Sequence, residues 1–386
     1  MGAPRGHDIL SNVTSFTFAT AHRIVFGAGR AAELPALIGE FGTRPFVCTG
    51  ADPTRFSGLL TGVADLAWWS VGGEPALDDI RAGVAAARDH GADVLVGLGG
   101  GAVLDAAKLI AALAPNGGDL LDYLEVIGAG RPLAESPLPF VAVPTTAGTG
   151  SEVTSNGVVT SPEHGVKVSL RSPSMLARVA LVDPELTLGC PPSVTASAGL
   201  DALTQCLEPY VSPFANPLTD GFCEQGLRRA GRSLRRAYAH GDDLDARTDM
   251  AVCALLGGLA LANAKLGAVH GLAGVIGGVT PAAHGAICGA LLGPVLAMNR
   301  DHAPDPARAV EICDEIAQIL DCAPADAPQA LARWARECGL PGLDSQGLAR
   351  ADHAAVAQAA LASSSMKGNP FPPDPAQLRA ILLSAA

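Results

Sequence analysis

The chain has 386 residues, of which 48% are hydrophobic and 17% charged, and its formal net charge is −12. This length exceeds what one hydrophobic core usually holds, so we expect two domains, and the composition excludes global disorder. The acidic balance disfavours nucleic acid or an anionic membrane as the main partner. Nine cysteines without a CxxC pair, and an N-terminus without an apolar signal core, predict a cytoplasmic protein with reduced thiols.

The first half alternates between short apolar segments and amphipathic ones. The short segments end in Gly, Pro or Thr and predict strands at 44–50, 66–73, 92–101, 139–146 and 179–184. Helical periodicity lies between them, at 76–91 and 102–114. This alternation predicts an α/β, Rossmann-like domain over residues 1–190, with a parallel sheet covered on both faces.

The second half, residues 191–386, lacks strand signals and predicts an all-helical domain. Its Ala- and Leu-rich segments predict helices at 193–211, 216–239, 244–268, 284–300, 305–321, 325–338, 350–362 and 375–385. With two domains of different class, we expect the functional site in the cleft between them.

Two loops in the first half have the chemistry of a nucleotide site. "GLGGGAVLDAAK" (97–108) is a strand end, a glycine turn and a helix start, which can cradle an anion but lacks the GxGxxG spacing. "PTTAGTGSEVT" (144–154) follows the next predicted strand and offers hydroxyl and backbone N–H groups. Alone, each could be an ordinary turn or a solvated loop. Together, at the ends of two strands, they predict one nucleotide at the sheet's C-terminal edge.

Four polar residues stand out in the apolar helical half. Asp201 and Gln205 are four residues apart and share a helix face, while Leu200, Leu203 and Leu207 are expected to face the core. His270 and His284 lie among small and apolar residues. Unpaired polar groups in such surroundings cost a few kcal/mol each, and one shared metal ion would satisfy all four. The alternative for each histidine is an ordinary hydrogen-bonded core residue.

Taken together, these motifs resemble the iron-containing (group III) alcohol dehydrogenases, whose fold is related to that of dehydroquinate synthase. The resemblance runs from "FTFATAHRIVFGAG" (16–29) through "AGLDALTQCLEPYVS" (198–212) to "SSSMKGNP" (363–370). It implies NAD or NADP, a divalent metal such as Fe or Zn, a small alcohol or carbonyl substrate, and a homodimer formed through an N-terminal strand.

The resemblance also implies roles for individual residues. The metal positions are Asp201, Gln205, His270 and His284, and the catalytic centre is the metal group of Asp201, His270 and His284. The cofactor positions are Gly99, Gly100, Gly101, Asp105, Thr145, Thr146, Thr149, Ser151 and Lys167.

The sequence departs from the family pattern at three places. Gln205 stands where the family normally has a third metal-binding His, and an amide oxygen is a poorer ligand for iron or zinc. Gly274 stands where a second His usually lies near the substrate. Gly50 stands where an acidic residue often holds the adenosine ribose, and Arg55 is close by in sequence, so NADP stays open.

These departures leave alternatives to a metal-dependent alcohol dehydrogenase. The first is a metal-independent reductase of the maleylacetate type, for which Arg171 and Lys367 are the candidate basic groups. The second is a lyase similar to dehydroquinate synthase, although no cluster of basic residues lies near the polar set. The third is a non-catalytic nucleotide binder whose metal site has decayed.

Overall fold

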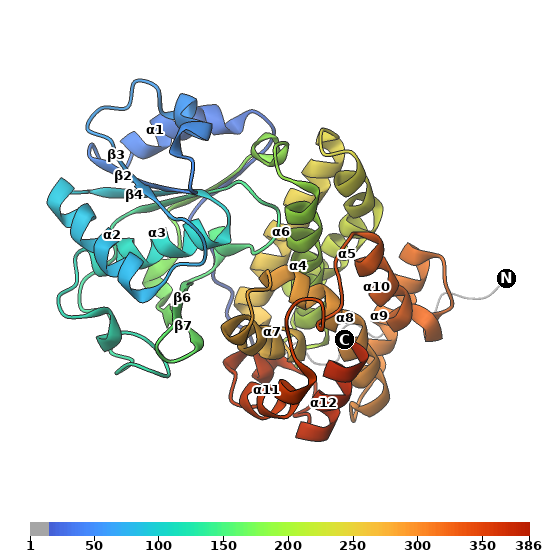
Figure 1. The fold of residues 1–386 in the computed structure, drawn as a ribbon. Coiled ribbons are helices and arrows are strands. Elements are labelled where there is room, and N and C mark those ends of the chain that lie inside the picture. Colours follow the sequence, from blue (N-terminus) through green and yellow to red (C-terminus); the bar gives the residue numbers. More distant parts are fainter. Residues whose placement is uncertain (1–14) are drawn as a thin grey trace.

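A computed structural model describes residues 15–386 as a sheet-containing half followed by a helical half (Figure 1). The sheet has six parallel strands in the order β1-β8-β5-β4-β2-β3. The strands are β1 Ile24–Phe26, β2 Pro45–Thr49, β3 Ala67–Ser70, β4 Val94–Gly99, β5 Phe140–Pro144 and β8 Val179–Val182. The predicted fold class is confirmed, and each of the five predicted strands corresponds to a strand of this sheet.

Both faces of the sheet are covered, which explains why its central strands are continuously apolar. One face packs against α2 (Leu77–His90) and α3 (Gly101–Leu113), and the other packs against α1 (Leu34–Gly39). Alternate residues of β4 divide between these two clusters: Leu95 faces the first, whereas Val94 and Val96 face the second.

A separate antiparallel hairpin, which the sequence did not predict, follows the threonine-rich loop. It consists of β6 (Asn156–Ser161) and β7 (Val166–Arg171) and is not part of the main sheet. It packs against α3 and against α7 of the helical half. The hairpin therefore connects the two halves of the molecule.

The described chain after residue 191 contains helices and turns and no strand. The helices are α4 Pro192–Val211, α5 Pro217–Ala239, α6 Leu244–Ala264, α7 Ala268–Val279, α8 His284–His302, α9 Ala307–Leu320, α10 Ala327–Glu337, α11 His353–Ala360 and α12 Pro375–Ser384. Helix α4 lies centrally, packed against α5, α6 and α8. Among the described residues no single helix has the length and hydropathy of a membrane span; only α6 and α7 taken together, with a 101° bend between them, meet that measure.

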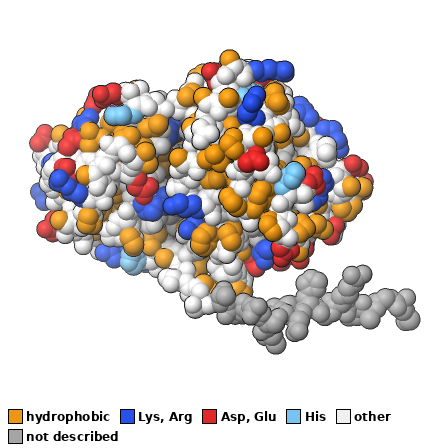
Figure 2. Space-filling model, turned by 90° about the horizontal axis from the view of Figure 1, so that it is seen from below, with side chains coloured by type: hydrophobic (Ala, Val, Ile, Leu, Met, Phe, Trp, Pro, Cys, Tyr) orange, Lys and Arg blue, Asp and Glu red, His pale blue; other side chains and the backbone are white. Residues whose placement is uncertain are grey.

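The surface carries charged side chains of both signs, and the cysteines are unpaired, as expected from the sequence. On the face shown in Figure 2, Lys and Arg side chains are interspersed with Asp and Glu on both lobes. All nine cysteines are free thiols, and seven of them are buried.

Candidate active site between the two halves

The glycine turn and the threonine-rich loop lie in direct contact at the carboxyl ends of β4 and β5. The Thr145 amide donates a hydrogen bond to the Gly99 carbonyl at 2.9 Å. A Cβ atom at Gly101 would lie 2.5 Å from Thr149 Cγ2, so only glycine allows this approach. The two loops that the sequence assigned to one nucleotide therefore form one continuous surface at the edge of the sheet.

Buried polar contacts hold these two loops in register. Asp105 accepts hydrogen bonds from Ser151 Oγ at 2.5 Å and from the Val158 amide at 3.1 Å. Lys108 Nζ donates to the Ser151 carbonyl at 2.9 Å and to Thr154 Oγ1 at 3.0 Å. Burial raises the pKa of the Asp105 carboxyl, although the charge of Lys108 and the hydrogen bond from Ser151 oppose this. Through these hydrogen bonds, Asp105 links α3 to the threonine-rich loop and to β6.

The threonine-rich loop also lies against the helical half, close to the polar residues on α4. A Cβ at Gly148 would be 2.9 Å from Ala198 Cβ, one turn before Asp201. Lys167 approaches from the hairpin: its Nζ lies 3.3 Å from Glu74 Oε2, and a Cβ at Gly277 of α7 would be 3.5 Å from it. The predicted cofactor positions thus reach the junction with α4 and α7.

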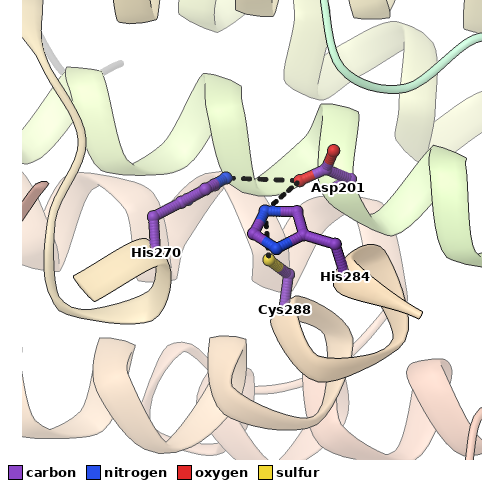
Figure 3. Close-up of side chains that lie close together, drawn as sticks. All are labelled: Asp201, His270, His284 and Cys288. Carbon is purple, nitrogen blue, oxygen red and sulfur yellow. Dashed lines mark hydrogen bonds and ion pairs between the residues drawn. The ribbon is translucent and has the colours of Figure 1, made fainter. Parts of the chain in front are cut away.

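Asp201, His270 and His284 converge from three helices, with their side chains directed toward one another (Figure 3). His270 Nε2 lies 3.3 Å from Asp201 Oδ1, and His284 Nε2 lies 3.9 Å from the same oxygen. The two imidazole rings are 5.3 Å apart between centroids. His270 lies in the first turn of α7 and His284 is the first residue of α8, so the starts of both helices face Asp201 on α4.

The electrostatics of this group fit a bound cation. Asp201 and Gln205 are each only 3% exposed, yet Asp201 Oδ1 and Gln205 Oε1 have no well-formed hydrogen bond. Burial opposes ionisation of Asp201, but the imidazole of His270, 3.3 Å from Oδ1, and that of His284 hold its pKa below the ordinary value. Burial lowers the pKa of His284, which favours the neutral form that binds metal. Two orphaned, buried acceptor oxygens are what a cation would satisfy.

Two further residues of this group were missed by sequence reasoning. Cys288 lies one turn after His284 on α8, and its Sγ is 3.7 Å from His284 Nε2. Its thiol, Asp201 and the two histidines each offer a ligand atom, and these four atoms all lie within 4.8 Å of one another. Glu208, two turns after Asp201 on α4, lies 2.6 Å from His270 Nδ1. Spacing alone could have suggested both, since each shares a helix face with a predicted ligand.

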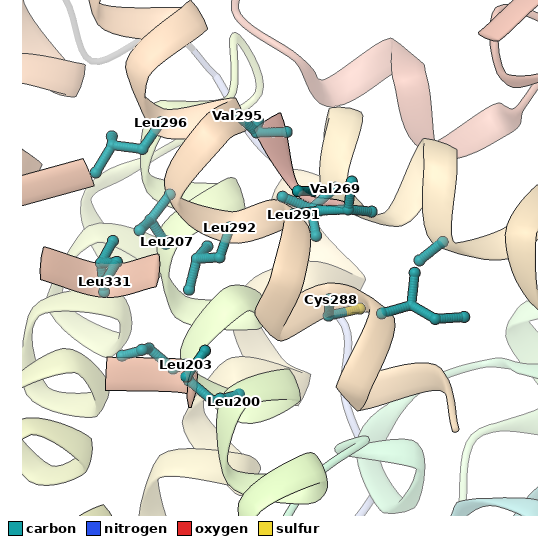
Figure 4. Packing of buried hydrophobic residues seen from close by; sticks show 14 of the residues in the cluster. Leu200, Leu203, Leu207, Val269, Cys288, Leu291, Leu292, Val295, Leu296 and Leu331 are labelled. Carbon is teal, nitrogen blue, oxygen red and sulfur yellow. The ribbon is translucent and has the colours of Figure 1, made fainter. Parts of the chain in front are cut away.

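The apolar side of α4 packs as predicted. Leu200, Leu203 and Leu207 are buried in one cluster with leucines of α8, and Cys288 belongs to the same cluster (Figure 4). The polar face of α4 is therefore held rigidly toward α7 and α8.

This arrangement defines a class of protein: a parallel-sheet domain with a nucleotide-type loop pair, joined to a helical domain with a buried Asp/His group suited to a metal. Residues 21–184 match the family described as iron-containing alcohol dehydrogenase, and residues 195–386 match its C-terminal domain. The chain belongs to the iron-containing alcohol dehydrogenase family.

Individual relatives agree with this membership. The chain is 37% identical over 314 residues to 1,3-propanediol dehydrogenase of Klebsiella pneumoniae, covering 80% of this chain and 79% of that enzyme. It is 46% identical over 212 residues to long-chain-alcohol dehydrogenase 1 of Geobacillus thermodenitrificans, but that alignment spans only 55% of this chain and 53% of the relative. The crystal structure of a 1,3-propanediol oxidoreductase superposes with a TM-score of 0.87 at 31% identity, covering 97% of this chain and 100% of the other.

Proposed function

We propose that this protein is an NAD(P)-dependent alcohol dehydrogenase that transfers hydride reversibly between nicotinamide C4 and a small alcohol, aldehyde or ketone. The observation that carries the proposal is the convergence of Asp201, His270 and His284 next to the loop pair at the sheet edge. The relatives named as alcohol and 1,3-propanediol dehydrogenases support the same reaction.

The chain's own residues have distinct tasks in this reaction. The glycine turn, the threonine-rich loop and Lys167 would bind and orient the dinucleotide, whose nicotinamide carries the redox chemistry. Asp201, His270 and His284 would hold a divalent metal, which supplies Lewis-acid polarisation of the substrate oxygen. Glu208 keeps the proton of His270 on Nδ1, because a carboxylate only accepts, and leaves Nε2 free to face the metal group.

The alternatives have less support in the geometry. A metal-independent reductase of a keto acid needs basic groups at the substrate site. Arg171 is instead half-exposed beside Glu125, 3.5 Å away, and Lys367 is exposed. A decayed nucleotide binder would have no reason to keep an oriented Asp/His group with orphaned acceptor oxygens.

The cofactor preference, assembly and location complete the proposal. We propose NAD or NADP as the cofactor. Gly50 has open space around it and places no acidic group there, and the Arg55 guanidinium lies near Gly189, so assays with NADH and NADPH decide between the two. We propose a homodimer, by resemblance, which light scattering of the purified protein tests. Nine free thiols suit a reducing compartment, so we propose a cytoplasmic location.

The test is an assay of NADH and NADPH oxidation with a panel of aldehydes and ketones, alongside metal analysis. Turnover should disappear on complete chelation and return with a divalent metal. Asp201→Asn should abolish turnover, whereas Asp301→Asn, at the far end of the same α8 that carries His284, should leave it unchanged. Turnover that survives complete removal of metal would refute the Lewis-acid role, and absence of turnover with every carbonyl would refute the reaction.

A further inference from the structure

We infer that Cys288 is a thiolate ligand of the metal site, so that Asp201, His270, His284 and Cys288 together hold the ion. The inference rests on the metal-dependent function proposed above. It predicts a site with one sulfur, which prefers zinc or cobalt to iron.

Two of the distances within this group match those between ligands of a tetrahedral zinc site. Zinc bonds of about 2.0–2.1 Å to nitrogen or oxygen and about 2.3 Å to sulfur place N and O ligands about 3.3 Å apart, and N and S ligands about 3.6 Å apart. The structure has 3.3 Å for His270 Nε2 to Asp201 Oδ1, and 3.7 Å for Cys288 Sγ to His284 Nε2. His284 Nε2 and Asp201 Oδ1 are 3.9 Å apart, so a movement of about 0.6 Å would bring them to the ligand spacing of about 3.3 Å.

The surroundings of Cys288 favour a ligand over a packing thiol. The residue is fully buried, and His284 Nε2, itself a predicted ligand atom, is the recorded partner of its Sγ. Independently, Asp201 Oδ1 in the same group is buried without a proper hydrogen bond. A thiol that only fills space would not need to lie within 4.8 Å of a buried carboxylate oxygen that lacks a hydrogen-bond partner.

The chemistry of the donors explains why the chain tolerates Gln205. A neutral amide oxygen is a weak ligand for a borderline-soft ion, whereas a thiolate binds Zn²⁺ strongly. On binding, a bond forms between the sulfur and the metal, the S–H bond breaks, and the proton passes to solvent. Four protein ligands are compatible with catalysis, since zinc sites can expand to five-coordinate.

The experiment loads the full-length protein with Zn²⁺ and, separately, with Co²⁺. X-ray absorption of the zinc form should show one sulfur at about 2.3 Å beside lighter ligands at about 2.0–2.1 Å. The cobalt form should show near-ultraviolet thiolate-to-metal charge transfer. Cys288→Ser should remove both signals and weaken zinc binding by at least about 10- to 100-fold, the range found even for outer-shell changes. Cys313→Ser, which alters a buried thiol of α9 outside the group, should keep them.

A second variant guards against misfolding. Gln205→His combined with Cys288→Ser should restore zinc affinity without restoring the sulfur signal, because imidazole replaces the thiolate. Stoichiometric metal without a sulfur neighbour, in a wild-type protein that turns over carbonyls, would overturn the inference and leave the proposed function intact. A sulfur-bound metal in a protein without turnover would support the inference and contradict the function.

Discussion

Glu208 Oε2 lies 2.6 Å from His270 Nδ1, and the other oxygen of the same carboxylate accepts a hydrogen bond from the Val269 amide at 2.6 Å. Glu208 is 1% exposed, so both contacts are made away from water. Burial disfavours a charged His270, but its contacts with the carboxylates of Asp201 and Glu208 prevail and raise its pKa to about 10 when no metal is present. One carboxylate thus fixes the start of α7 and the orientation of the imidazole.

Glu208→Gln should therefore weaken metal binding about 10- to 100-fold, as is typical when a partner of a metal-bound histidine is lost. The amide oxygen can still accept from Val269, but the amide nitrogen cannot accept the imidazole proton. Chelator competition measures the metal affinity directly. Glu337→Gln, on an exposed carboxylate paired with Arg235, is the matched control and should bind metal like the wild type. Equal affinities in both variants would show that Glu208 supports only the fold.

Gly101→Ala should weaken NAD(P)H binding by about tenfold or more, equivalent to about 1.4 kcal/mol. The new methyl group would press on Thr149 and separate the two loops of the proposed nucleotide site. Fluorescence titration with NADH and NADPH measures the effect.

The companion experiment removes the obstacle. Thr149→Ala in the Gly101→Ala background should recover part of the affinity, because the atoms nearest to the added methyl, Thr149 Cγ2 at 2.5 Å and Oγ1 at 2.8 Å, are then absent. If the double variant binds no better than Gly101→Ala alone, the contact between these side chains is not the cause of the loss.

Gly150→Ala should destabilise the junction between the two halves more than either of two related substitutions. Gly150 has φ +61° and packs against the backbone of Gly258, so alanine adds both backbone strain and a clash. Gly258→Ala adds only the clash, with Gly150 Cα 2.7 Å away, and Gly29→Ala adds only strain, at φ +75° with open space around it. The clash alone and the strain alone should each lower the free energy of unfolding by about 1–3 kcal/mol. Thermal unfolding should therefore show the lowest melting temperature for Gly150→Ala. A Gly150→Ala variant no less stable than Gly29→Ala would contradict the close packing.

The fold was predictable where apolar pattern and local propensity agree. The strands around residues 46, 95 and 141 are continuous apolar segments because helices cover both faces of the sheet. The β6–β7 hairpin was missed because half of its residues are polar or only partly buried. Helix α7 was missed because it contains four glycines, so packing against its neighbours, rather than intrinsic propensity, stabilises it.

The site shows the same division. The i, i+4 spacing of Asp201 and Gln205 predicted a shared helix face, but nothing in the chain order shows that His270 and His284 meet Asp201. That convergence depends on how α4, α7 and α8 pack together, and the family resemblance predicted it. The spacing of His284 and Cys288 indicates a shared helix face, but only the fold shows that the Cys288 Sγ lies 3.7 Å from His284 Nε2.

The last prediction concerns pH and a buried carboxyl beside the cofactor loops. Glu152 is 3% exposed, and burial raises its pKa to about 7 from an ordinary 4.5, only partly opposed by a backbone N–H group and by Lys108. Since the pKa is higher in the folded state, the stabilisation from the protonated form is complete below about pH 4.5. It is lost as the pH rises through about 7.

Glu152→Gln should remove this dependence, because the amide stays neutral at every pH. At pH 8 the variant should be more stable than the wild type by about 3 kcal/mol, at about 1.4 kcal/mol per unit of pKa shift, and at pH 4.5 the two should be close. Urea unfolding across this range measures the difference, with Glu163→Gln as an exposed control. Because Lys108 is the cation whose charge lowers this pKa, Lys108→Met should enlarge the pH effect, and a Glu152→Gln curve parallel to the wild-type curve would show that another group is responsible.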